Sequence, residues 1–377
     1  MSYQETTTPR FFIDYLQYYY AIGKAMPGKT EHIWNTPINT GTNLTRGLVG
    51  LNPSWDVRTK GLTAAAHGGW NVQHFISSFP VHQMNCIGLL GHNLVSAPGS
   101  ATFGMAYHTY NSNGNQTWPY AQNSDPEIKI NCTGTQSAMT PTFDGFSFSS
   151  TNETNQPDLD PVEGTSWVGC VVRSIDDATN DFEHRIGSNF WGRYWNMPMA
   201  ADLSMTMSID MDGVDQKTSK GGSTLSNATH FGPPDCGNLP AWTLSGDAQS
   251  TAWSEEFETR RPGRRSWKLS FSYLSQEKMF PGIATHTSYF NPEAYDDGVN
   301  ANIAGGWNDL NSDSQDNFIS QIWSKTLGPH LPFVFQPDKD NDSPDTFAIC
   351  RFKENSLQIE KIANSLYKIS VTIVESW

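Results

Sequence analysis

The chain has 377 residues and a formal net charge of −14, and although only 37% of its residues are hydrophobic, it holds 13 Trp and 12% aromatic residues. Abundant Gly, Pro, Asn, Ser and Thr disfavour long amphipathic helices and favour short strands joined by polar turns. The acidic balance argues against a nucleic-acid-binding protein. Because no signal pattern and no apolar run of about 18 residues is found, we expect no membrane insertion and a chain that is made in the cytoplasm and stays soluble.

The N-terminal arm, residues 1–60, opens with the aromatic run FFIDYLQYYYAIG and continues as coil rich in Gly, Pro and Asn. We expect this arm to pack on the C-terminal lobe or to reach a neighbouring molecule. No internal repeat of the kind that builds solenoids or propellers is found in the chain.

Residues 61–257 alternate strand-like bursts with long polar stretches, which is typical of a β-sandwich with extended loops. The apolar segment 86–90 predicts a strand buried on both faces, and the segment 101–114 is expected to pair with it. The polar tract over about 111–187 predicts a long insertion in this sandwich.

Residues 258–377 have the most regular pattern and predict a second β-rich lobe. The segment 312–329 predicts one docked helix, about 313–327, with a Ser or Asp cap and a Gly-Pro stop. The final segment predicts a hairpin that turns at 363–365. A half-buried strand is predicted by four residues that alternate with polar ones: Trp267, Leu269, Phe271 and Tyr273.

The string GKAMPGKT, from Gly23 to Thr30, matches the phosphate-binding pattern G-x-x-x-x-G-K-[ST]. A true phosphate-binding loop needs a buried strand before it and a helix after it. Three tyrosines precede this string, Pro37 follows it closely, and no second nucleotide motif stands out. We therefore interpret the match as a turn and expect no cofactor.

Asp338, Asp340 and Asp342 alternate in QPDKDNDSPD like the start of a calcium loop, but the glycine and the glutamate that complete such a loop are missing. We favour a solvated turn and expect no metal. The five cysteines are far apart without a C-x-x-C pair, which indicates free thiols. No catalytic residue can be assigned, so the sequence predicts a protein that is not an enzyme.

The stretch TRRPGRRSWKLSFSYLS, residues 259–275, concentrates cations in an acidic chain. Pro262-Gly263 divides four arginines into two pairs around a turn: Arg260, Arg261, Arg264 and Arg265. Arginine at a turn tip suits bidentate pairing with carboxylates. Two interpretations stay open, a solvated hairpin tip or docking onto an acidic surface of the same chain or a partner. If the arginines dock, replacing all four by Ser should weaken assembly and leave the monomer folded.

Several strings resemble segments of tailed-phage virion structural proteins, including distal tail and baseplate components, and together they cover about half of the chain. They are VHQMNCIGLLGHNLVSAPGSATFGMAYHTY, FWGRYWNMPM, LSMTMSIDMDG, ETRRPGRRSWKLSFSYLS, LPFVFQPDKDNDSPDTFAICRF and YKISVTIVESW. In that family a GHNL turn and a later RYWR-like strand belong to a galactose-binding-like, discoidin-type sandwich. Here Asn196 stands where the second arginine of that strand is expected, and the insertion has no counterpart.

The resemblance implies a jelly-roll-like or galactose-binding-like sandwich over 61–257, followed by the second β-rich lobe. It also implies a structural role in a virion assembled in the host cytoplasm, at the tail tip or baseplate, with contacts to other copies of itself in a ring and to neighbouring virion proteins. Three alternatives stay open: a carbohydrate-binding module for a host surface glycan that uses an exposed tryptophan such as Trp118, a capsid decoration protein, and a hydrolase of unknown type.

Overall fold

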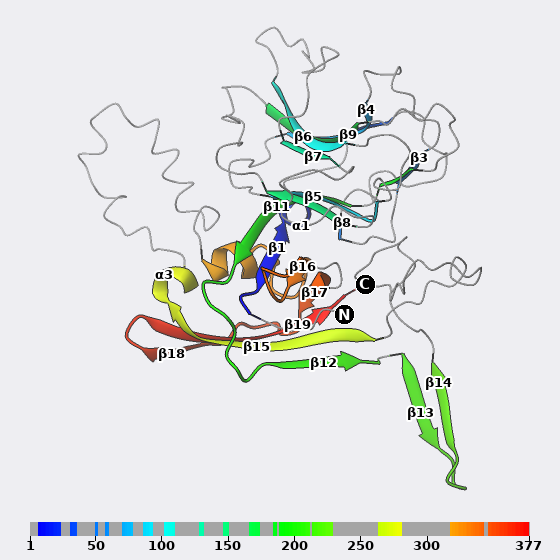
Figure 1. Cartoon of the computed structure of the whole chain (residues 1–377), viewed down its shortest axis with the longest axis vertical. Helices are drawn as coiled ribbons and strands as arrows, with labels where there is room; N and C mark the ends of the chain where they lie inside the picture. The colour runs from blue at the N-terminus through cyan, green and yellow to red at the C-terminus, as the bar shows by residue number, and fades with distance from the viewer. Residues whose placement is uncertain are drawn as a thin grey trace.

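The computed structural model describes residues 7–23, 31–35, 50–51, 57–59, 70–77, 86–92, 102–109, 128–131, 146–150, 166–173, 184–186, 188–211, 213–228, 263–280, 317–342 and 346–376. Over this part of the chain the protein is built from antiparallel strands, and helical segments are few and short (Figure 1). The prediction of an all-β fold is confirmed. The helical segments are α1 (Tyr15–Ala21), α3 (Gln276–Met279) and the π-helical η5 (Ile319–Trp323).

A ten-stranded antiparallel sheet forms the body of the molecule, and its strands come from the whole length of the chain (Figure 1). It takes strands from all three ranges that the sequence separates, 1–60, 61–257 and 258–377. In spatial order its strands are β12 (Thr206–Asp210), β15 (Arg264–Ser275), β19 (Leu366–Glu375), β17 (Ala348–Phe352), β16 (Phe333–Gln336), β1 (Arg10–Asp14), β11 (Asn189–Asn196), β5 (Cys86–Leu90) and β8 (Phe146–Ser150), with β18 (Ile359–Ala363) also paired to β19.

A second, five-stranded sheet lies over the β11–β5–β8 end of the first (Figure 1). Its strands are, in spatial order, β2 (Glu31–Asn35), β4 (Trp70–Ser77), β9 (Ser166–Arg173), β6 (Thr102–Thr109) and β7 (Ile128–Asn131). The expected pairing between 86–90 and 101–114 is wrong, because β5 pairs with β11 and β8 whereas β6 pairs with β7 and β9. The predicted insertion also supplies strands to both sheets, including the central β9.

Two further strand pairs complete the described structure. β3 (Val57–Thr59) pairs with β10 (His184–Ile186), and β13 (Val214–Thr218) pairs with β14 (Thr224–Ala228). The β13–β14 pair, which we call the ribbon, extends away from the body of the molecule beyond the end of β12 (Figure 1).

β1 lies in the interior of the large sheet and is buried on both faces. Successive side chains of a strand point to opposite faces, so Phe11 and Ile13 enter one hydrophobic core while Phe12 enters the other. The Phe11 ring lies 5.3 Å from the Phe335 ring, and the Phe12 ring lies 4.7 Å from the Phe148 ring. The aromatic run at the N-terminus is therefore a core strand that both halves of the sheet share.

β15 confirms the predicted alternation over its first half only. Trp267, Leu269 and Phe271 are buried as expected, but Tyr273 is 64% exposed and Leu274 is buried in its place. The pairing of β15 with β19 shifts register between Phe271 and Leu274. Such a bulge adds one residue to the strand and exchanges the faces beyond it, and the two-residue period cannot reveal this.

The C-terminal segment forms the predicted hairpin. β18 and β19 pair in antiparallel fashion, and Ala363 lies across from Leu366 on either side of the turn. Ser365 in this turn has a positive φ of 58°. The last strand turns one apolar face to the core, because Ile369, Val371 and Ile373 are buried.

The predicted range 313–327 is described from residue 317 onward, and its helical segment η5 is a π-helix, which is wider than an α-helix. The Asn317 side chain accepts a hydrogen bond from the backbone N–H of Ser320 at 2.8 Å, and the residues around 313, where the sequence places the cap, lie outside the described residues. The Ser324 N–H donates to the carbonyl of Ile319, which makes a π-helical turn. Gly328, with a φ of +64°, ends the segment at the expected Gly-Pro.

Asp14 joins the end of β1 to the start of α1 and is almost fully buried. Its carboxylate accepts hydrogen bonds from the backbone N–H of Leu16 at 3.0 Å and the side-chain amide of Gln17 at 2.9 Å. The N–H of Trp191 on β11 approaches the same carboxylate at 3.4 Å. Burial raises the pKa of Asp14 from its ordinary 3.8 to about 7, and these hydrogen bonds oppose that rise.

The raised pKa of Asp14 predicts a pH-dependent stability. Between pH 4 and about 7 the folded chain binds this proton and the unfolded chain does not, so this contribution to the free energy of unfolding falls as pH rises. Asp14→Asn keeps a neutral acceptor and removes the titration. From pH 5 to 8 the wild type should lose about 2–3 kcal/mol relative to this variant in urea unfolding.

The control for this experiment is Asp215→Asn, which removes an exposed carboxylate on the ribbon. We expect its pH profile to follow that of the wild type. Parallel profiles for wild type and Asp14→Asn would contradict the assignment of the pH dependence to Asp14.

Candidate functional site

The arginine turn of the sequence leads into β15, beside the edge strand β12. Arg260 and Arg261 lie outside the described residues, and Arg264 and Arg265 begin the strand. Gly263 precedes them with a φ of +76°, and a Cβ at this position would lie 2.8 Å from Ile209 Cγ2 and 3.0 Å from the Asp210 carbonyl oxygen. Glycine is needed here because β12 passes so close and because the backbone is left-handed.

Arg265 points into the protein and forms a buried ion pair with Glu375 of β19. Arg265 and Glu375 are each 1% exposed, and Arg265 Nη2 lies 3.0 Å from Glu375 Oε1. The Arg265 backbone N–H and Nε both donate to Glu375 Oε2, at 2.9 and 3.3 Å. Nη2 also donates to the Phe347 carbonyl at 3.1 Å. This bidentate geometry gives both charges several partners without water.

The docking interpretation allowed Arg265 a carboxylate on the same chain or on a partner, and in the structure that carboxylate is buried within the same chain. The carboxylate that satisfies this arginine belongs to the same chain, and its guanidinium also lies 5.2 Å from the Trp267 ring. Replacing Arg265 by Ser would leave the buried Glu375 uncompensated, so we expect this arginine, unlike an exposed one, to contribute to the stability of the monomer. Within the described part of the cluster, only Arg264 is partly exposed.

β12 forms the outer edge of the ten-stranded sheet. It pairs with β15 on one side, with Met207 across from Trp267 and Ile209 across from Arg265, and no described strand pairs with its other side. Cross-strand partners share a face of the sheet, so Met207 and Ile209 lie on the side of the buried core. Ile209 is nevertheless 53% exposed.

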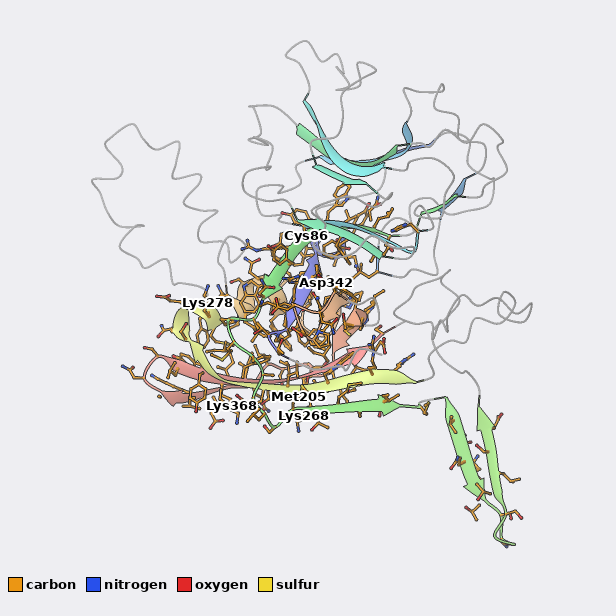
Figure 2. All side chains as sticks on the ribbon, in the orientation of Figure 1. Cys86, Met205, Lys268, Lys278, Asp342 and Lys368 are labelled. Carbon is orange, nitrogen blue, oxygen red and sulfur yellow. The ribbon has the colours of Figure 1, made fainter. Side chains whose placement is uncertain are left out.

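The ribbon continues from this edge and carries little buried surface. Along β13 every residue is exposed, and its turn is closed by hydrogen bonds between Ser219 and Ser223. Figure 2 shows the ribbon side chains pointing to both sides of the two strands, away from the body of the molecule. Several exposed apolar side chains lie in the edge strand, in the ribbon or in the residues next to them: Leu203, Ile209, Met211, Val214 and Leu225.

The string LSMTMSIDMDGV alternates apolar and polar residues, but nothing in the sequence marks it as an edge or a site. The alternation predicts a half-buried strand, and a strand of that kind can lie in the middle or at the border of a sheet. The available signal was the run of apolar residues with few charges between Leu203 and Val214. Such a run is ordinary in an interior strand, whereas an edge strand commonly contains a lysine or a proline that prevents pairing with other chains. The run by itself therefore favours an interior position.

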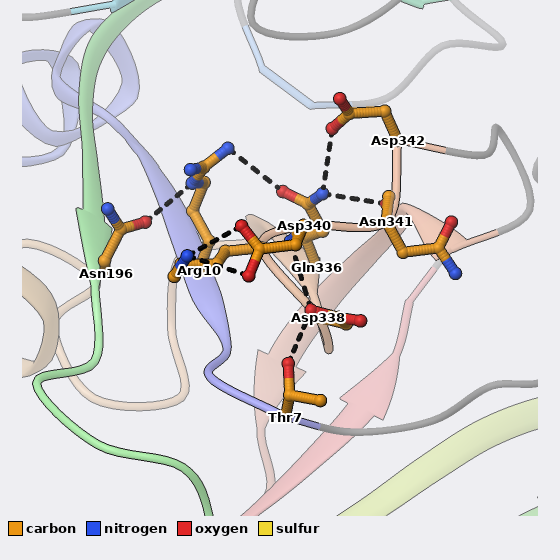
Figure 3. Close-up of polar contacts among 9 residues, drawn as sticks. Thr7, Arg10, Asn196, Gln336, Asp338, Asp340, Asn341 and Asp342 are labelled. Carbon is orange, nitrogen blue, oxygen red and sulfur yellow. Dashed lines mark hydrogen bonds and ion pairs between the residues drawn. The ribbon is translucent and has the colours of Figure 1, made fainter.

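The carboxylates of the three aspartates in the predicted calcium-like loop have different side-chain partners, and Asp338 also accepts a hydrogen bond from the backbone N–H of Asp340 at 3.1 Å (Figure 3). The Thr7 hydroxyl donates to Asp338, Lys339 forms an ion pair with Asp340 at 2.7 Å, and the Gln336 amide donates to Asp342 at 3.4 Å. Among the described residues, no group of three or more His, Cys, Asp or Glu side chains could hold a metal ion.

This loop instead belongs to a polar network that ties three strands together (Figure 3). Arg10 on β1 donates through Nε to Asn196 of β11 at 2.6 Å and through Nη1 to Gln336 of β16 at 3.5 Å. Burial lowers the pKa of Arg10, while Asp342 and Asp340 favour its charged form. The network fixes the register of β1 against both of its neighbours.

The other residues singled out in the sequence carry no binding geometry in the described structure. Trp118, the candidate glycan contact, lies outside the described residues. The string that begins at Gly23 follows the helix α1 and precedes the strand β2, an order opposite to that of a phosphate-binding loop. Cys86 and Cys350 are buried and not part of a disulfide, and burial raises the pKa of Cys86.

Neither the described helices nor the comparisons with known proteins point to a particular class of protein. None of the described helices combines the length and the apolar character needed to cross a membrane. Comparison with known protein families, with curated proteins and with solved structures found no match to this chain.

The buried ion pair predicts a large asymmetry between single and double substitutions. Arg265→Met leaves the Glu375 carboxylate buried without its partner, and we expect it to cost about 3–5 kcal/mol of unfolding free energy. Adding Glu375→Leu should recover most of that loss, because two apolar side chains replace two compensated charges. Urea unfolding of the two variants measures both effects.

Lys268→Met is the matched control, because Lys268 lies on the exposed face of the same strand (Figure 2). We expect it to change the unfolding free energy by about 0.5 kcal/mol or less. Equal stability of the Arg265→Met and Lys268→Met proteins would contradict the structural role given to Arg265.

Proposed function

We propose that this chain is a non-enzymatic structural component of a phage virion, at the tail tip or baseplate, that acts through self-assembly and contacts with neighbouring virion proteins. The virion assignment rests on the resemblance of its sequence strings. The assembly role rests on one structural observation, the ribbon that projects from the edge of the large sheet (Figure 1).

The ribbon supports an assembly role because its two strands have little stabilisation of their own. An isolated two-stranded hairpin is at best marginally stable in water. Here the strands are exposed, and the ion pair between Lys217 and Asp215 is exposed too, so it contributes little. A packing partner would cover the apolar Val214 and Leu225, which lie on opposite faces of the ribbon.

The ribbon also suits a contact with two surfaces at once. Val214 lies across from Ala228, and Leu225 lies across from Lys217, so each face presents one large apolar side chain among polar ones. A ribbon that inserts between parts of a neighbouring molecule would cover both faces. This is the arrangement expected of an arm that links copies in a ring.

Removing the ribbon should separate assembly from folding. Val214 and Ala228 are cross-strand partners, so an Asn-Gly turn can replace residues 215–227 without stretching the chain. We expect an unchanged melting temperature, because exposed residues are removed, and a marked loss of self-association. Mass photometry over a concentration series and a melting curve make the two measurements.

Point variants provide the matched control. Leu225→Ser should weaken self-association, whereas Ile362→Ser, on the exposed side of β18, should not. If the shortened protein assembles as the wild type does, the ribbon is not part of the interface. A wild-type chain that stays monomeric at about 100 μM, where an interface with a Kd of about 1 μM would be mostly occupied, and that binds glycans on an array would overturn the proposal in favour of a receptor module.

The position in the virion has its own test. Antibodies raised against the purified full-length chain should label the tail tip of intact particles. Labelling of the head would favour a capsid decoration protein and overturn the tail-tip assignment.

A further inference from the structure

We infer that the free side of β12 is an interface for a second copy of this chain, and that the two β12 strands pair with each other across a two-fold axis. This inference rests on the proposed role in self-assembly and names the surface that carries it. It uses an observation independent of the ribbon, the composition of the sheet edge.

The first argument is the backbone. A strand at a sheet edge presents a row of N–H and C=O groups that another strand can pair with. Thr206–Asp210 makes its ladder hydrogen bonds to β15 on one side, and no strand of the described residues pairs with its other side. A copy of the same strand supplies matching donors and acceptors.

The second argument is the absence of the devices that usually protect an edge. Protected edges carry lysine, proline, a bulge or an inward-pointing charge. The register of β12 against β15 is continuous over all five residues, and the strand TMSID contains neither lysine nor proline. Its one charge, Asp210, lies at the end of the strand across from Arg264.

The third argument is self-complementarity. When two antiparallel copies overlap fully, Ser208 of one copy lies across from Ser208 of the other, and Met207 lies across from Ile209. Like charges do not meet, because Asp210 lies across from Thr206. Sliding one copy by an even number of residues keeps every side chain on its own face of the sheet. The slid pairing that places Asp210 across from Asp210 brings two like charges together, which disfavours it.

The pairing would also cover apolar surface that the isolated chain exposes. Met207 and Ile209 lie on the core side of the sheet, and an even register places the core sides of the two sheets together. Ile209, 53% exposed in one copy, would then pack against the Met207 of the second. Leu203, which is fully exposed just before β12, lies close enough in sequence to join this contact.

A charge exchange at Ser208 tests this geometry, because residue 208 is the only one predicted to meet itself. Ser208→Lys places two lysines across the axis, and Ser208→Glu places two glutamates there. Each variant alone should associate about fivefold or more weakly than wild type, since like charges directly opposite destabilise strand pairs. An equal mixture should regain wild-type association, because lysine then meets glutamate.

Sedimentation velocity of each variant and of the mixture gives the result, and labelling one variant with a fluorophore shows whether the two kinds of chain associate. Ser370→Lys and Ser370→Glu are matched controls, because Ser370 is exposed on β19, an interior strand of the same sheet. We expect no effect of either control on association.

The possible results separate this inference from the proposed function. Rescue in the mixture supports two-fold pairing. Weakening without rescue would overturn the two-fold register, and unchanged association of both variants would overturn the edge as an interface while leaving self-assembly intact. A wild-type chain that does not associate at all would overturn the self-assembly role itself.

Discussion

The large sheet depends on the double pairing of β1. In spatial order β1 stands between β16 and β11, so it is the strand that joins β12, β15, β19, β17 and β16 to β11, β5 and β8. Phe12 lies across from Tyr194 on one side and Val334 on the other, and its side chain fills the core on one face. Each buried side chain of this size contributes about 1.5–3 kcal/mol, so a short strand can hold two halves together.

The polar groups at both ends of β1 make this placement specific. At one end, Arg10 donates hydrogen bonds to Asn196 and Gln336. At the other end, the Asp14 carboxylate accepts hydrogen bonds from Leu16 and Gln17 of α1 and from the backbone N–H of Trp191. Shifting β1 by one residue would move Phe11 and Phe12 to the wrong cores and break these bonds. By contrast β12 and the ribbon have few buried contacts, which leaves the periphery of the molecule available for other chains.

The sequence predicted the parts of this fold that follow from local periodicity. Alternation identified β15 and the hairpin of β18 and β19, and a continuous apolar run identified β5. It could not predict the bulge after Phe271, the pairing of β1 with strands far along the chain, or the partner of Arg265, because each depends on contacts between distant segments. Arginine near a turn looks the same in sequence whether its carboxylate lies in solvent or in the core. The position of β12 at the edge of the sheet likewise follows only from the order of the strands, which the sequence does not reveal.

The claim that β1 couples the two halves of the sheet can be measured by native-state hydrogen exchange as a function of urea. If β1 holds them together, the amides of β16, β1 and β11 should exchange only through the global unfolding that also opens β15 and β19, with one common free energy. Exchange of the β11 and β5 amides at a free energy several kcal/mol lower, while β15 and β19 stay protected, would contradict the account.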